Sequence, residues 1–128
     1  MKRGFALFLC ALLCIAFSAC SAVDIPADST GTLRFIYEKE KIITEIGSDD
    51  LHTLAEMFRG RVLYSDSPSC GFSEDISLVI GGQTFCFAND GCAIIYISEK
   101  NRYFHITYEE GVTLREILTS YGFHFPCH

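Results

Sequence analysis

Alternation of apolar and polar residues predicts a series of short strands after residue 31. The strands that this alternation indicates are 32–37, 41–46, 61–64, 75–80, 83–87, 93–97 and 102–106. The strongest signal is the pair around Gly81-Gly82, because two glycines between two apolar runs are typical of a tight hairpin. Strands joined by turns this short pair in antiparallel fashion.

Two stretches repeat their apolar residues with the helical period instead. The first is expected to begin with Ser48 as N-cap and to end at Gly60. The second covers 110–121, and Thr107 and Glu110 have the spacing of a capping box at its start. The order β-β-α-β-β-β-β-β-α predicts an α+β fold, in which two helices pack on one face of an antiparallel sheet.

The first 19 residues have a different pattern, that of an export signal. Lys2 and Arg3 are followed by an uninterrupted apolar stretch from Phe5 to Phe17, which is short for a transmembrane helix. The segment Phe17-Ser18-Ala19-Cys20 resembles the lipobox of bacterial lipoprotein precursors. The resemblance implies cleavage before Cys20 and acylation of its thiol with chains such as palmitate. The alternative is an ordinary secretory signal cleaved near Ala22.

These patterns divide the chain into three parts. Residues 1–19 are interpreted as the signal peptide, 20–31 as a flexible tether rich in small and polar residues, and 32–128 as one α+β domain. Two fatty chains would hold the protein firmly at a bilayer. The expected location is therefore the extracytoplasmic face of the cell membrane, with the membrane itself as a partner through the lipid anchor.

Charge narrows the choice of other partners. Removing Lys2 and Arg3 from the ten basic residues leaves eight against sixteen acidic ones, a balance of −8. So acidic a domain is a poor binder of nucleic acid, since it would repel the phosphates. We therefore expect no nucleic-acid partner, and a protein or another envelope component instead.

Four cysteines follow the export signal and Cys20, namely Cys70, Cys86, Cys92 and Cys127. An even number in a small exported domain favours two disulfides. We expect Cys86 to pair with Cys92 across the turn Asn89-Asp90-Gly91, and Cys70 to pair with Cys127. The alternatives are a zinc site or a redox pair, although the six-residue step from Cys86 to Cys92 suits neither.

Two histidines of the C-terminal tail are weak candidates for metal binding. His124 and His128 flank Cys127 in the tail, and imidazole is a common ligand of zinc and copper. A metal-binding protein or an envelope enzyme that uses this cluster, with His105 as a further candidate, is the second functional hypothesis. No catalytic residue is assigned and no cofactor is expected, because the sequence has no nucleotide-binding, serine-hydrolase or zinc-protease motif.

The leading hypothesis is a non-enzymatic binding module. It rests on the predicted lipid anchor, the expected disulfides and the lack of a catalytic motif, and it places binding on the sheet or on the long loop at 66–74. Tyrosine would suit such a surface, since it gives rigid contact area with a polar tip. The tyrosines that could line an exposed sheet face are Tyr37, Tyr64, Tyr96, Tyr103 and Tyr108. The alternative role of these rings is cross-strand packing. The stretch from Ser67 to Cys92 also resembles a pattern in small lipoproteins of Gram-positive bacteria, which implies the location and no activity.

Overall fold

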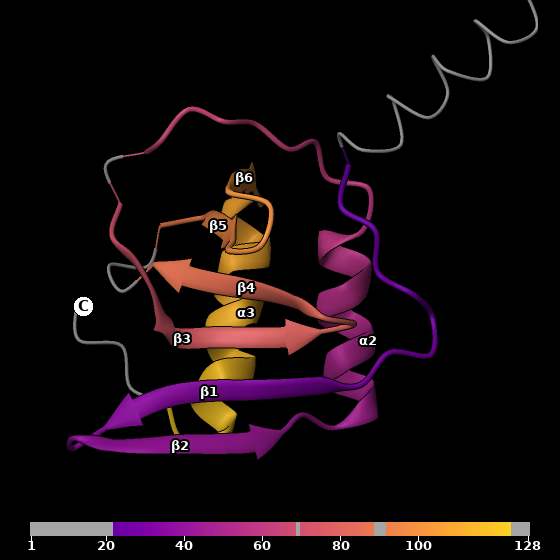
Figure 1. The fold of residues 1–128 in the computed structure, drawn as a ribbon. Helices are drawn as coiled ribbons and strands as arrows, with labels where there is room; N and C mark the ends of the chain where they lie inside the picture. Colours follow the sequence, from indigo (N-terminus) through magenta and orange to yellow (C-terminus); the bar gives the residue numbers. More distant parts are fainter. Residues whose placement is uncertain (1–21, 69, 89–91, 124–128) are drawn as a thin grey trace, which may run out of the picture.

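The computed structural model describes residues 22–68, 70–88 and 92–123. They form six strands and two helices (Figure 1). The strands are β1 (Gly31–Tyr37), β2 (Glu40–Glu45), β3 (Phe72–Ile80), β4 (Gln83–Ala88), β5 (Ile94–Ile97) and β6 (Arg102–His105), and the helices are α2 (Ser48–Phe58) and α3 (Tyr108–Ser120).

All six strands belong to one antiparallel sheet with the order β2-β1-β3-β4-β5-β6. Both helices lie on the same face of this sheet (Figure 1). The predicted α+β class is thus confirmed, and so is the packing of two helices on one face. Short connections join the strands from β3 to β6, so β1 and β3 are the only neighbours in the sheet that a helix of the described chain separates in sequence.

The hydrophobic core fills the space between the sheet and the helices. Its central contacts are aromatic: the Phe58 ring of α2 lies 5.3 Å from that of Phe85 and 5.4 Å from that of Phe104, between centroids. The strands contribute alternate residues, as period-two patterning requires. The residues that are almost completely buried include Leu33, Phe35, Leu54, Leu78, Ile80, Ile95, Ile97 and Leu118.

The segment before β1 is part of the fold, which corrects the predicted tether. Val23 and Ile25 are buried in the core. The Val23 amide donates a hydrogen bond to the Arg61 carbonyl (3.0 Å), and the Gly60 amide donates one to the Val23 carbonyl (2.9 Å). Because alternate residues of this extended segment turn inward, residues 22–25 behave as a strand would. The flexible tether predicted for 20–31 is therefore wrong for residues 22–25.

The helix ends agree with the sequence at two of the three predicted points. The capping box of Thr107 and Glu110 is present, and Gly60 follows α2 with a positive φ of 79°. The N-cap of α2 is Gly47 instead of Ser48. Its amide donates to the hydroxyl of Tyr121 (2.7 Å), so the residue that follows α3 supplies the acceptor that the N3 side chain supplies in a capping box.

The predicted strand 61–64 is reduced to two isolated bridges. Val62 pairs with Ala22, and Tyr64 pairs with Tyr103 of β6. Tyr64 and Tyr103 exchange both of their backbone hydrogen bonds, each 2.9 Å long. The outer edge of β6 is therefore partly covered, whereas β2 has no described neighbour on its outer side.

Candidate functional site

The face of the sheet opposite the helices carries the residues with the most chemistry. We call it the open face. The strand residues that point to it include Arg34, Ile36, Ile43, Ser77, Val79, Thr84, Cys86, Tyr96, Tyr103 and His105. The strand register places one row straight across this face, from Arg34 through Ser77, Cys86 and Tyr96 to Tyr103. The bridge to Tyr64 extends the row beyond β6.

Five rings gather at the β5–β6 end of this row. We call them the aromatic cluster, which consists of Tyr64, Phe72, Tyr96, Tyr103 and His105. The Tyr96 and Tyr103 rings have centroids 4.9 Å apart, and Tyr64 stacks on His105 at 4.8 Å with an angle of 13° between the planes. Phe72 joins Tyr96 and Tyr103 at 5.9 and 5.5 Å. These separations are those of mutually packed aromatic rings.

The rings of the aromatic cluster pack against one another, and some of them remain accessible to solvent. Tyr96 and Tyr103 are partly exposed, and His105 is exposed. The Tyr64 hydroxyl is buried and has no hydrogen-bond partner among the described residues. Burial raises the pKa of Tyr64, and the neighbouring Tyr103 and Asp66 raise it further. Three of the five tyrosines named from the sequence thus meet in the cluster.

The other two tyrosines lie elsewhere. Tyr37 ends β1, and Tyr108 begins α3 with 83% of its surface exposed. Sequence reasoning missed Phe72 and His105 as members of the cluster. For His105 a signal existed, because it lies two residues after Tyr103 and so points to the same face of the strand. For Phe72 there was none, because the strand was expected to begin at residue 75.

A bulge in β3 covers the centre of the open face. Phe72 pairs with Ala88 and Ser77 pairs with Cys86, so β3 contains three more residues than β4 over this interval. The Ser77 hydroxyl donates to the Glu74 carbonyl (2.9 Å), while the Glu74 carboxylate accepts from the hydroxyl of Ser98 on the other side of β4 (2.9 Å). The bulge therefore carries Glu74 over the small residues of the row and buries them.

The thiol of Cys86 lies under this cover. Cys86 is buried and forms no disulfide. Burial raises the pKa of its thiol to about 11, with further contributions from the charges of Glu74 and Glu99. At neutral pH this thiol therefore keeps its proton, and a protonated, buried sulfur is a poor nucleophile.

Glu99 is the second carboxylate near the thiol. It accepts hydrogen bonds from the backbone amide of Thr84 (2.6 Å) and from its hydroxyl (2.7 Å). Burial by itself would raise the pKa of Glu99, but these bonds, its own backbone amide and the charge of Arg34 lower it overall. Glu99 is thus a charged group that fixes the β5–β6 turn to β4.

The disulfide of the described residues joins Cys70 and Cys92, with Cα atoms 6.7 Å apart. The expected pairs Cys86–Cys92 and Cys70–Cys127 are therefore wrong. The reason is the register: because Phe72 lies opposite Ala88, the residues just before β3 and just after β4 meet. Cys86 is inside β4, where its side chain points into the row between Ser77 and Tyr96.

The remaining predicted site residues do not come together in the described structure. Cys20, His124, Cys127 and His128 lie outside the described residues. Within residues 22–68, 70–88 and 92–123, no group of three or more His, Cys, Asp or Glu side chains is placed to hold a metal ion. His105 stacks on Tyr64.

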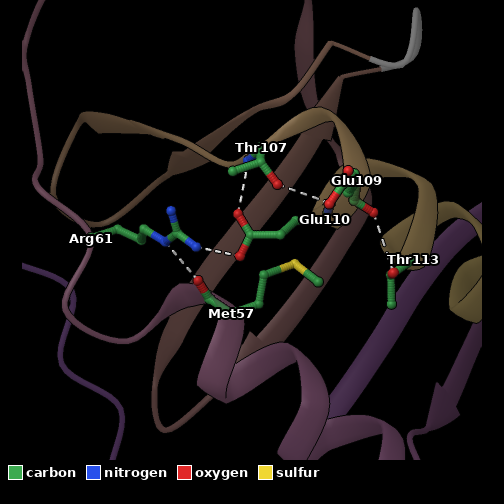
Figure 2. Close-up of polar contacts among 6 residues, drawn as sticks. All are labelled: Met57, Arg61, Thr107, Glu109, Glu110 and Thr113. Carbon is green, nitrogen blue, oxygen red and sulfur yellow. Dashed lines mark hydrogen bonds and ion pairs between the residues drawn. The ribbon is translucent and has the colours of Figure 1, made fainter.

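A polar network links the two helices on the other side of the sheet (Figure 2). Arg61 donates to the Met57 carbonyl at the end of α2 (2.8 Å) and forms an ion pair with Glu110 in the first turn of α3. The second carboxylate oxygen of Glu110 accepts from the Thr107 amide (2.8 Å). The carboxylate thus completes the capping box and neutralises Arg61, which gives this network a structural role.

One concave site lies between the segment before β1 and α2. The cavity has a volume of about 200 Å³, and its lining includes Pro26, Ser29, Ser48, His52 and Arg59. The Arg59 guanidinium is already occupied, because it donates to the Ile25 carbonyl (3.0 and 3.2 Å) and pairs with Glu56. Among the described residues, the cavity therefore has one imidazole at its wall and no unpaired arginine.

Comparison of the chain with protein-family models, with curated proteins and with solved structures finds no match in any of the three. Among the described residues, no helix combines the length and the apolar character needed to cross a bilayer.

Proposed function

We propose that this chain is a lipid-anchored, extracytoplasmic binding module that recognises a protein, a peptide or another envelope component through its aromatic cluster. The sequence supports the location, through the export signal that ends at Cys20. The contact surface is supported by one observation above all: partly exposed rings of β5 and β6 gather on a sheet face that no described helix covers.

The chemistry of the aromatic cluster suits binding. Tyrosines that are held by packing lose little side-chain entropy when a partner arrives, and their hydroxyls provide hydrogen bonds at the rim. Tyr103 already directs its hydroxyl toward the Ser67 hydroxyl (3.4 Å), and Tyr96 donates to the side chain of Asn101 (3.0 Å). The cluster is thus an oriented platform with polar edges.

The sulfur chemistry supports a structural role for the described cysteines. Cys70 and Cys92 are joined to each other, and Cys86 is a buried, protonated thiol. The disulfide lies just before Phe72 in the chain, so it restrains one ring of the aromatic cluster. This arrangement stabilises a surface for binding.

The test is site-specific photo-crosslinking in living cells. Tyr96 is replaced by p-benzoylphenylalanine in the full chain, and the matched control carries the same residue at Tyr108, which is highly exposed on the helix side of the molecule. We expect light-dependent adducts of discrete mass from position 96 and none from position 108. Absence of adducts at position 96, or equal adducts at both positions, would contradict the proposal.

A further inference from the structure

The folded domain begins almost directly after the proposed lipidation site. Only Ser21 separates Cys20 from Ala22, and Ala22 is already paired with Val62. An extended chain advances at most about 3.6 Å per residue, so the Cα atom of Ala22 lies within about 7 Å of that of Cys20. The hydrogen bonds of Val23 and the burial of its side chain leave no slack after this point.

An exposed apolar side chain lies at the same place. Val62 is 75% exposed, the highest value of any large aliphatic residue of the described chain. It faces Ala22 across an antiparallel bridge, in which opposite Cα atoms are about 5 Å apart. Val62 is therefore within about 12 Å of the Cα atom of Cys20. The headgroup layer of one leaflet is only about 6 Å thick, so a lipid on Cys20 would hold Val62 within about two such thicknesses of the lipid attachment site.

The charges around Val62 are compatible with a lipid surface. The domain as a whole is acidic and would be repelled by anionic headgroups. The charged side chains nearest to Val62 in sequence, however, are Arg59 and Arg61. Arg59 forms an ion pair with Glu56, and Arg61 forms one with Glu110, which Figure 2 shows. Asp24, which is exposed two residues after Ala22, adds one negative charge, so this part of the surface combines a low net charge with an apolar side chain.

We infer that the surface around Ala22 and Val62, which we call the anchor face, rests against the lipid headgroups and fixes the orientation of the domain on the membrane. This inference depends on the proposed lipidation of Cys20. Tyr64 of the aromatic cluster lies two residues after Val62. The binding platform is therefore held beside the bilayer, where it meets partners at the membrane surface, and is not displayed on a long tether.

The experiment uses tryptophan fluorescence, because the chain contains no tryptophan. Val62→Trp is made in the full chain, the lipidated protein is purified, and it is reconstituted into vesicles of phosphatidylethanolamine and phosphatidylglycerol with and without brominated acyl chains. The matched control is Ile43→Trp. Ile43 is also a β-branched residue, is 59% exposed, and lies on β2 at the opposite edge of the sheet.

We expect the emission of the Val62→Trp protein to shift to shorter wavelength and to be quenched severalfold more strongly than that of the Ile43→Trp control. Equal quenching in the two proteins, with the lipid present on Cys20 by intact mass, would overturn the orientation and leave the proposed function standing. A mature protein whose mass lacks the lipid would overturn the lipid anchor and this inference together. Both substitutions are at exposed positions, and circular dichroism serves as the check that the variants fold.

Discussion

The two faces of the sheet differ in chemistry: one is built from apolar packing, and the other retains polar groups and a thiol. The helix-covered face buries aliphatic and phenyl side chains, and the Phe58 ring contacts three other phenyl rings there. The open face contains both buried polar residues of the described chain, Ser77 and Thr84, together with the free thiol of Cys86. The helix-covered face contributes apolar packing to the core. The open face retains polar side chains and a thiol that apolar packing does not require.

The largest expected effect is on the helix-covered face. Phe58→Ala should lower the free energy of unfolding by about 3–5 kcal/mol, because the cavity would remove contacts with Phe85, Phe87 and Phe104. The measurement is urea unfolding followed by circular dichroism. Ile43→Ala on the open face is the control and should change the value by less than about 0.5 kcal/mol. Similar losses in both variants would show that the two faces do not differ as described.

Removal of the disulfide should have the next largest effect. A bridge between Cys70 and Cys92, 22 residues apart, stabilises by about 3 kcal/mol in the loop-entropy description. The double variant Cys70→Ser, Cys92→Ser should lose this amount in urea unfolding, and it should also loosen Phe72 and thus the aromatic cluster. Peptide mapping without reductant provides the independent check. A peptide that joins Cys86 to Cys92 would refute the assignment.

The ionisation of Cys86 should have the smallest effect on the free energy of unfolding, and this effect appears only at alkaline pH. An unfolded thiol titrates near pH 9.0, whereas the folded thiol, with its pKa raised to about 11, keeps its proton up to about that pH. Between these values the unfolded state binds fewer protons, so the free energy of unfolding falls as the pH rises, by roughly 2 kcal/mol from this group. In Cys86→Ala this share of the decline should disappear, as measured by urea unfolding from about pH 7 to about pH 11.

Two tyrosines also contribute to the loss of stability at alkaline pH. Burial raises the pKa values of Tyr64 and Tyr121, so the wild type and Cys86→Ala will both lose stability in alkali. The prediction therefore concerns the difference between the wild type and Cys86→Ala at each pH. Identical slopes would mean that the thiol is ionised at the same pH in both states, which its burial does not allow.

The local features of the fold were predictable because their causes are local. Gly81-Gly82 favours a hairpin between two apolar runs, and Thr107 and Glu110 cap a helix from within four residues. The alternation of β1, β5 and β6 likewise indicates which residues are buried, whereas β4 has buried residues on both faces. The residues on the helix-covered face of the sheet are therefore predictable from sequence alone.

Features that depend on distant partners were not predictable in this way. Val23 and Ile25 stand among Ser, Asp and Pro, and two apolar residues are too few to indicate a strand. Their burial goes with the pairing of the Val23 backbone with Gly60 and Arg61. The turn chemistry of 89–91 favoured Cys86 as the partner of Cys92, but only the β3–β4 register shows that Cys70 lies closer. The aromatic cluster depends on the same register.

The order of the strands also has a consequence for the speed of folding. The hairpins from β3 to β6 close over a few residues each, whereas β1 must find β3 across α2 and the long connection that follows it. Bringing distant segments together costs chain entropy before any contact compensates for it, so this docking step should limit the rate. Extra residues inserted into the 65–68 stretch should accordingly slow refolding, while the unfolding rate changes little.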